Sequence, residues 1–171
     1  MSTAYVSTRA GLVIMSGDDP SMFSSQNEQD NRHYAELSYM PLIEPSNSQE
    51  AKDFIIYAFD ISEQTGSPVL FRTTTRVSHQ RGIVEFGKLA EIKNKSHFIK
   101  DPSKLVLLPA TAYRMKKDLL NRFYKLREIS ENSPLNKIIN NNSKMGIITS
   151  GAGYNSVMDA ILMSDIKVDV L

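Results

Sequence analysis

Short apolar runs that alternate with polar segments constrain the fold of this chain more than any other feature. Residues 11–15, 41–45 and 68–71 are apolar runs bounded by turn-forming residues, which is typical of strands. Between the second and third runs, apolar residues recur at three- and four-residue steps, which predicts a helix that ends near Gly66. The order strand, loop, strand, helix, strand favours an α/β layer with parallel strands.

The helix predicted between the second and third runs has two alternative starts. Ser46 and Gln49 have the spacing of a capping box, and Asn47 with Glu50 gives a rival frame. Five residues form its apolar face: Ala51, Phe54, Ile55, Ala58 and Ile61. We also expect a short helical stretch within residues 26–38, with Tyr34, Leu37 and Ser38 on one side, and a short extended piece at residues 83–86.

A long helix is predicted after residue 110, with Thr111 as its cap. Four apolar residues at helical spacing would face inward: Met115, Leu119, Phe123 and Leu126. Five basic residues would form its solvated face: Lys116, Lys117, Arg122, Lys125 and Arg127. Nothing aromatic interleaves this basic face, so the pattern does not indicate base stacking.

The end of the sequence predicts a second α/β unit. Residues 145–149 read as a buried strand, a glycine-containing turn leads into a helix that runs to about Met163, and residues 167–171 begin another strand. The asparagine run at 140–143 is typical of a linker. We therefore expect a first domain at 1–105, a long helix and linker at 106–143, and the truncated start of a second domain at 144–171.

Composition excludes several classes of protein. The chain has 171 residues, 41% of them hydrophobic and 23% charged, which is compatible with a packed core. A net charge of +1 argues against nucleic-acid binding, and no apolar run approaches the roughly 20 residues of a membrane span. The first residues lack the pattern of a signal peptide, so we expect a cytoplasmic protein. The absence of cysteine excludes disulfides, thiolate metal sites and a cysteine nucleophile within this chain.

The longest polar segment, residues 16–32, follows the first predicted strand. Ligand sites in α/β folds lie at the carboxyl ends of strands, which makes this segment a candidate pocket loop. Its four carboxylates, Asp18, Asp19, Glu28 and Asp30, are hard oxygen donors of the kind that bind Ca²⁺ or Mg²⁺. Their spacing does not fit a calcium loop, and carboxylates that cap turns are the alternative. We therefore predict no metal site.

A second polar segment, residues 72–79, follows the third predicted strand and reads Arg-Thr-Thr-Thr-Arg-Val-Ser-His. Arg72 and Arg76 are suited to hold a carboxylate or phosphate, and His79 titrates near neutral pH and is suited to proton transfer. The alternative is that Arg72 or Arg76 pairs with the carboxylate loop and fixes its packing. We expect six residues of the two segments to meet in one cleft: Asp18, Asp19, Ser24, Ser25, Gln26 and Arg76.

A glycine turn, residues 150–153, lies between a predicted strand and a predicted helix. Its backbone N–H groups are suited to hold an anion, but the full dinucleotide fingerprint is absent. A tight structural turn is therefore the alternative to an anion site.

These polar strings resemble those of one family. Residues 16–32, the string at 72–79 and the Gly-Ile-Ile-Thr-Ser-Gly strand and turn at 146–151 resemble the alpha subunit of indolepyruvate ferredoxin oxidoreductase, one of the thiamine-diphosphate-dependent 2-oxoacid:ferredoxin oxidoreductases. The resemblance implies an incomplete, parallel-sheet, pyrimidine-type domain of the kind that binds thiamine diphosphate. The start of a transketolase-C-terminal-like α/β domain would follow. The implied reaction is oxidative decarboxylation of an arylpyruvate to an acyl-coenzyme A, with ferredoxin as electron acceptor.

The resemblance also implies pocket residues, cofactors and partners. The pocket residues would be Asp18, Asp19, Ser24, Ser25, Gln26, Asn27, Arg72, Arg76, Ser78 and His79. Thiamine diphosphate, magnesium and an iron–sulfur cluster would serve the parent enzyme, and none has a complete site in this chain. Phe23 stands where the family is expected to carry histidine. The partners would be other segments or subunits of the oxidoreductase, ferredoxin, coenzyme A and the 2-oxoacid. The alternative is a non-catalytic α/β scaffolding module that has lost the cofactor domains.

Overall fold

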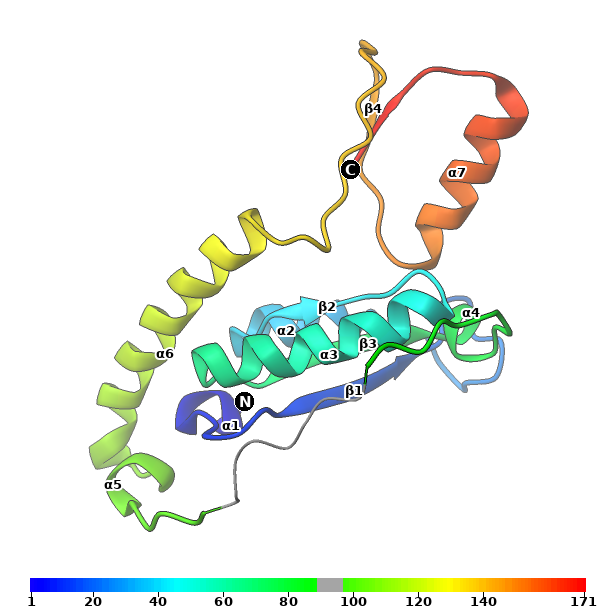
Figure 1. The fold of residues 1–171 in the computed structure, drawn as a ribbon. Helices are drawn as coiled ribbons and strands as arrows, with labels where there is room; N and C mark the ends of the chain where they lie inside the picture. Colours follow the sequence, from blue (N-terminus) through cyan, green and yellow to red (C-terminus); the bar gives the residue numbers. More distant parts are fainter. Residues whose placement is uncertain (89–96) are drawn as a thin grey trace.

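Two parallel sheets organise the chain in the computed structural model, which describes residues 1–88 and 97–171 (Figure 1). The larger sheet has the order β1-β3-β2, built from β1 (Val13–Asp18), β2 (Leu42–Ile43) and β3 (Val69–Thr74). The smaller sheet pairs β4 (Gly146–Ile147) with β5 (Asp169–Val170). Every pairing between these named strands is parallel, which confirms the prediction of an α/β layer.

β3 is the central strand of the larger sheet, and its residues Val69, Leu70 and Phe71 are buried. β1 lies at an edge of this sheet, so the prediction of a buried strand at residues 11–15 is wrong in part. Met15 of β1 is exposed, because the strand has a neighbour on only one side within the described residues. β1 also continues to Asp18, since its polar end stays paired with the end of β3.

The helix α3 (Ser48–Thr65) packs its apolar face on this sheet. Phe54, Ala58 and Ile61 are buried together with Phe71 of β3 in one core cluster. The helix ends at Gly66, which has a φ of 68°, a conformation that glycine adopts without strain. The predicted helix, its inward face and its end are therefore confirmed.

Of the two alternative starts of α3, the Asn47–Glu50 frame is confirmed. The Asn47 Oδ1 accepts a hydrogen bond of 2.9 Å from the backbone N–H of Glu50. The Glu50 carboxylate accepts one of 2.8 Å from the backbone N–H of Ser46. Two N–H groups at the helix start are thereby satisfied by side chains.

We expect Asn47→Ala to lower the free energy of unfolding by about 1 kcal/mol, the typical contribution of a side-chain N-cap. Urea denaturation of the two proteins measures this difference. Asn121→Ala, at an exposed position inside a different helix, is the control, and we expect a change within about 0.5 kcal/mol. An Asn47→Ala variant as stable as the parent would show that the cap does not stabilise the fold.

The long helix α6 (Pro109–Glu131) packs beside α1 (Ser2–Val6) and follows α5 (Pro102–Leu105). Met115, Leu119 and Leu126 are buried as predicted, and Phe123 packs edge-on against the ring of Tyr39. The predicted cap is wrong. Leu108 is the N-cap, and Thr111 lies three residues later, where its Oγ1 accepts a 3.1 Å hydrogen bond from the Leu108 N–H.

Two basic residues predicted on the solvated face of α6 are half-buried instead. Arg122 donates a hydrogen bond to the carbonyl of Ala4 in α1. Lys116 lies with its Nζ 3.7 Å from the centre of the Tyr39 ring. Packing of α1 and Tyr39 against this part of α6 covers these side chains, which a helical pattern alone does not reveal.

Smaller elements differ in detail from the sequence expectations. α2 (Arg32–Ser38) buries Ala35 and Ser38, whereas Tyr34 and Leu37 are exposed. The extended piece expected at residues 83–86 forms no strand, and Ile83 and Phe86 are exposed. A short helix, α4 (Thr75–Ser78), follows β3 directly.

The second unit consists of β4, α7 (Ala152–Ser164) and β5. β4 is shorter than the predicted buried strand, and Ile148 beyond it is exposed, because β4 pairs only with β5 in the described chain. The asparagine run is hydrogen-bonded to this unit: the Asn141 N–H donates to Asp169 at 2.7 Å and the Ser143 Oγ donates to the Lys167 carbonyl at 2.7 Å. Figure 1 shows the unit above the end of the larger sheet.

Candidate functional site

A buried ion network lies at the carboxyl ends of the three larger-sheet strands. The Arg72 Nε and Nη2 donate to one oxygen of Asp18 at 2.8 and 2.7 Å, and the Arg72 Nη1 donates to Glu44 Oε1. The side chains of Arg72, Asp18 and Glu44 are only 4%, 1% and 8% exposed. Parallel pairing of β1 with β3 sets Asp18 opposite Thr74, two residues beyond Arg72 in β3, and Glu44 follows β2 directly. The alternative that Arg72 pairs with the carboxylate loop is therefore confirmed.

The neighbouring carboxylate, Asp19, closes the start of the polar loop. Its Oδ2 accepts hydrogen bonds from the N–H groups of Ser24 and Ser25 at 2.7 and 2.8 Å. Its Oδ1 accepts a 2.6 Å hydrogen bond from the hydroxyl of Thr75. The Thr75 hydrogen bond and those from the loop backbone hold the pKa of Asp19 well below its usual range. The far end of the loop is attached too, because the Asn31 N–H donates to Asp18 at 3.1 Å.

The depressed pKa of Asp19 predicts a pH dependence of stability. A carboxyl whose folded pKa lies below its unfolded value of roughly 3.9 stabilises the fold above that pH and loses this contribution as the pH falls through the folded pKa. Asp19→Asn should therefore be less stable than the parent at pH 7, and the difference in stability between the two proteins should become smaller in acid. The midpoints of urea denaturation of both proteins at pH 7, 5, 4 and 3 measure this difference. Asp60→Asn, at an exposed position of α3, is the control. A stability difference between Asp19→Asn and the parent that stays constant with pH would contradict the lowered pKa of Asp19.

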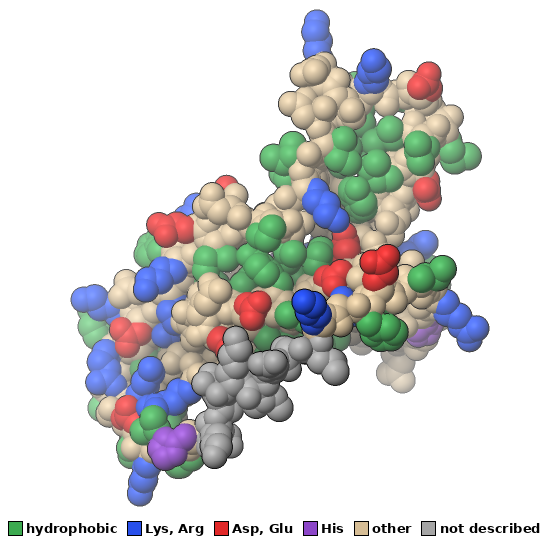
Figure 2. Space-filling view, in the orientation of Figure 1, with side chains coloured by type: hydrophobic (Ala, Val, Ile, Leu, Met, Phe, Trp, Pro, Cys, Tyr) green, Lys and Arg blue, Asp and Glu red, His purple; other side chains and the backbone are tan. Residues whose placement is uncertain are grey.

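A cleft of about 250 Å³ opens above the ion network. It is lined by Pro20, Phe23, Arg32, Glu44, Arg72, Thr74, Thr75, Arg76, Ala152 and Gly153. The guanidinium carbon of Arg76 lies 5.7 Å from the centre of the Phe23 ring, so the two polar segments meet here. Figure 2 shows acidic and basic side chains gathered where the β4–α7–β5 unit meets the larger sheet.

The structure brings together some of the expected pocket residues and leaves others apart. Arg72 and Arg76 line the cleft, whereas Asp18, Asp19, Ser24 and Ser25 are bonded within the loop and to its neighbours. The remaining four do not line it: Gln26, Asn27, Ser78 and His79 are exposed. The Ser78 Oγ instead forms a 3.1 Å hydrogen bond with the Thr73 hydroxyl.

Sequence reasoning missed Glu44 and Arg32 as residues of this cleft. Burial raises the pKa of Glu44 above its usual range, against the opposing attraction of the Arg72 and Arg32 guanidiniums. Its Oε2 is buried and has no hydrogen-bond partner among the residues described. Arg32 is held by Asp30 through hydrogen bonds of 2.8 and 2.6 Å. Glu44 lies near the end of the strand predicted at residues 41–45, and it directly follows the observed strand β2, which ends at Ile43. The rule that selected residues 16–32 finds it once the true end of this strand is known.

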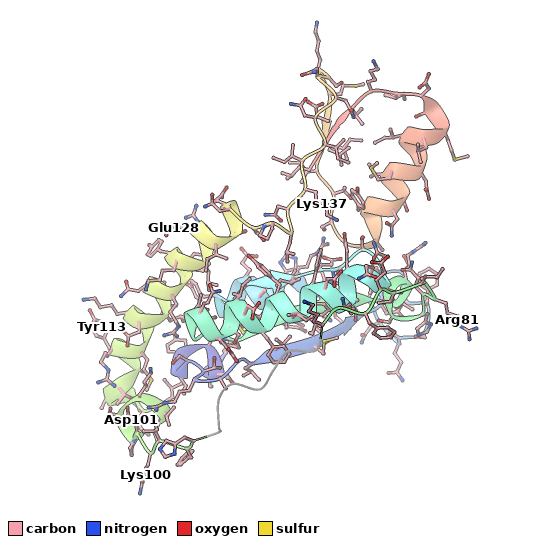
Figure 3. All side chains as sticks on the ribbon, in the orientation of Figure 1. Arg81, Lys100, Asp101, Tyr113, Glu128 and Lys137 are labelled. Carbon is pink, nitrogen blue, oxygen red and sulfur yellow. The ribbon has the colours of Figure 1, made fainter. Side chains whose placement is uncertain are left out.

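The second unit touches this site through its glycine turn. Gly151 has a φ of 55°, and a Cβ at this position would collide with the Glu44 carboxylate. The Asn155 side chain of α7 donates a 2.8 Å hydrogen bond to the Ser46 carbonyl, and Lys137 forms an ion pair of 2.8 Å with Glu50. Figure 3 shows Lys137 between the two units. The turn thus closes tightly on the larger sheet.

Two kinds of feature are absent from residues 1–88 and 97–171. No helix in these ranges is both long enough and apolar enough to cross a membrane. No three His, Asp or Glu side chains in these ranges lie together as a metal-binding group.

Comparison with known proteins gives one consistent result. No protein-family model matches the chain. The indolepyruvate oxidoreductase subunit IorA of Methanothermobacter marburgensis is 50% identical over 100% of this chain, and that of Archaeoglobus fulgidus is 40% identical over 99%. The IorA subunit of Pyrococcus abyssi is 46% identical over 94% of the chain. The chain spans only 28%, 27% and 26% of the length of these three relatives. The resemblance is thereby confirmed, and the chain is homologous over its whole length to one segment of the indolepyruvate oxidoreductase IorA subunits.

Proposed function

We propose that this chain contributes part of the substrate pocket of an indolepyruvate, or arylpyruvate, ferredoxin oxidoreductase. The reaction would be oxidative decarboxylation of the 2-oxoacid to an acyl-coenzyme A, with electrons passed to ferredoxin. The observation that carries the proposal is 40–50% identity to IorA subunits over nearly the whole chain. A cleft with three arginines at the carboxyl ends of parallel strands supports it, since such a cleft suits an anionic substrate.

The pocket residues have different roles in this proposal. Arg76, exposed at the cleft, would hold the substrate carboxylate, and Arg72 would form the rigid floor with Asp18. Asp19, with Ser24 and Ser25, would fix the loop that carries Phe23 to the cleft. Four exposed residues would act only where the rest of the enzyme approaches this surface: Gln26, Asn27, Ser78 and His79.

The cofactors expected from the family do not fit this chain alone. An iron–sulfur cluster needs thiolate ligands, and the sequence contains no cysteine. Magnesium with thiamine diphosphate needs a set of oxygen ligands, and no three Asp, Glu or His side chains lie together as a metal-binding group in the described residues. We therefore derive no chemical step through either cofactor and assign their binding to other segments or subunits. Residues 1–105 and 144–171 would belong to the pyrimidine-type and transketolase-C-terminal-like domains.

The partners in this proposal are the remaining segments and subunits, ferredoxin, coenzyme A and the 2-oxoacid. The scaffolding alternative is not favoured, because the similarity to IorA subunits covers 94–100% of the chain in the three comparisons given above. The cytoplasmic location expected from the sequence stays a prediction.

A chimeric enzyme tests the proposal. In the IorA subunit of M. marburgensis, the matching segment is replaced by this chain, and the complex is purified with its partner subunits. Indolepyruvate-dependent reduction of an electron-accepting dye is then measured without oxygen, beside the parent complex. We expect the chimera to assemble and to retain this activity. A chimera that elutes as the parent complex but does not oxidise indolepyruvate would contradict the proposal.

A further inference from the structure

The cleft contains a buried hydroxyl that nothing in the described structure satisfies. Thr74, the last residue of β3, is only 7% exposed, and its Oγ1 has no hydrogen-bond partner among the residues described. Thr74 lies among the residues that line the cleft. A buried hydroxyl without a partner is unfavourable unless a ligand or water satisfies it, so its place in the cleft points to a bound polar group.

One arginine that lines the cleft is suited to bind an anion. Arg72 forms ion pairs with two carboxylates, Asp18 and Glu44, and Arg32 forms an ion pair with Asp30. Arg76 differs from both, because it forms no ion pair within residues 1–88 and 97–171 and contacts the Phe23 ring instead. One cleft-lining guanidinium with five N–H donors is therefore left for an oxygen anion.

The second unit adds backbone donors to the same cleft. Ala152 and Gly153, at the start of the 13-residue helix α7, line the cleft. No side chain among the described residues caps this helix start, so its first N–H groups are open to a ligand. The positive end of the helix dipole favours a negative group at this position.

We infer that the cleft is an oxyanion site shared by the two α/β units. One carboxylate or phosphate group is held by the Arg76 guanidinium, the Thr74 hydroxyl and the N–H groups at the start of α7. The Phe23 ring beside Arg76 suits a ligand whose anionic group carries an aromatic body. The choice of an aryl 2-oxoacid as the natural ligand rests on the proposed function, whereas the site itself rests on the three kinds of donor.

Binding to the 171-residue chain tests the site without any enzyme activity. The ¹⁵N-labelled chain is titrated with inorganic phosphate, with indole-3-pyruvate and with uncharged indole-3-ethanol, and the amide signals are followed by NMR. We expect both anions to shift the signals of Ala152 and Gly153 with saturation, and the alcohol to leave them in place. Saturable shifts from phosphate alone would identify a phosphate group and overturn the carboxylate ligand.

Two variants locate the donors. Arg76→Gln should weaken the binding of either anion at least about tenfold, as expected for the loss of a charged hydrogen bond. Thr74→Val keeps the shape of the side chain, and we expect a loss of about three- to tenfold. Arg81→Gln is the matched control, since Figure 3 places this exposed arginine beyond α4 and away from the second unit.

The outcomes separate this inference from the proposed function. Unchanged affinity in both variants, at unchanged melting temperature, would overturn the site. Absence of saturable shifts with both anions would overturn it too, whether or not the chimeric enzyme is active. Anion binding that both variants weaken, together with an inactive chimera, would support the site and contradict the proposed function.

Discussion

Replacing Arg72 with methionine should destabilise the chain by about 3–5 kcal/mol, the loss expected when one partner is removed from a buried ion pair. The variant leaves the Asp18 and Glu44 carboxylates without their common cation, and their side chains are 1% and 8% exposed. The free energy of unfolding from urea denaturation measures the effect.

Arg76→Met is the matched control for this prediction. The two arginines lie four positions apart, but Arg76 is exposed and forms no ion pair in the described part of the chain. We expect its replacement to change the free energy of unfolding by no more than about 0.5 kcal/mol. Equal losses in the two variants would mean that the ion network does not hold the strand ends together.

Gly151→Ala should detach the second unit from the larger sheet. An alanine at a φ of 55° is strained by about 1–3 kcal/mol. Its Cβ would also collide with the Glu44 carboxylate, which cannot turn aside without breaking its hydrogen bond to Arg72. Amide hydrogen exchange measures the detachment. We expect exchange in α7 to be faster in the variant than in the parent, and exchange in α3 to change less.

Gly146→Ala is the control within the same unit. A Cβ there would lie 3.9 Å from the nearest atom, the Asp169 carbonyl oxygen, which is an ordinary contact. We expect stability and exchange in this variant to match the parent. Unchanged exchange of α7 in Gly151→Ala would contradict the close contact between the glycine turn and Glu44.

The arrangement of the larger sheet could be predicted because its signals are local. Apolar runs mark β2 and β3, and helical spacing with Gly66 marks the extent of α3. The carboxyl-end rule placed Arg72 and Arg76 at the sheet edge where the cleft lies, because parallel strands bring their ends to one edge. Of the six residues expected to meet in one cleft, only Arg76 lines it. These inferences need no knowledge of which side chains become buried.

The burial and the contacts of individual polar residues could not be predicted in the same way. Arg72 and Arg76 look alike in sequence, but Arg72 belongs to β3 and forms ion pairs with two carboxylates, Asp18 and Glu44. Arg76 falls in α4, beyond the strand, and remains exposed. The contact between Gly151 and Glu44 depends on how the second unit docks, and no short-range pattern encodes that docking. Tertiary placement, rather than local pattern, therefore decides these roles.

The Michaelis constant of Arg76→Lys in the chimeric oxidoreductase tests most directly whether this chain supplies the carboxylate-binding arginine. Lysine keeps the charge but loses the planar pair of donors, so we predict a KM for indolepyruvate about tenfold higher. The melting temperature should not change, because Arg76 is exposed and free of ion pairs in the described chain. An unchanged KM, with or without a lower melting temperature, would contradict the account.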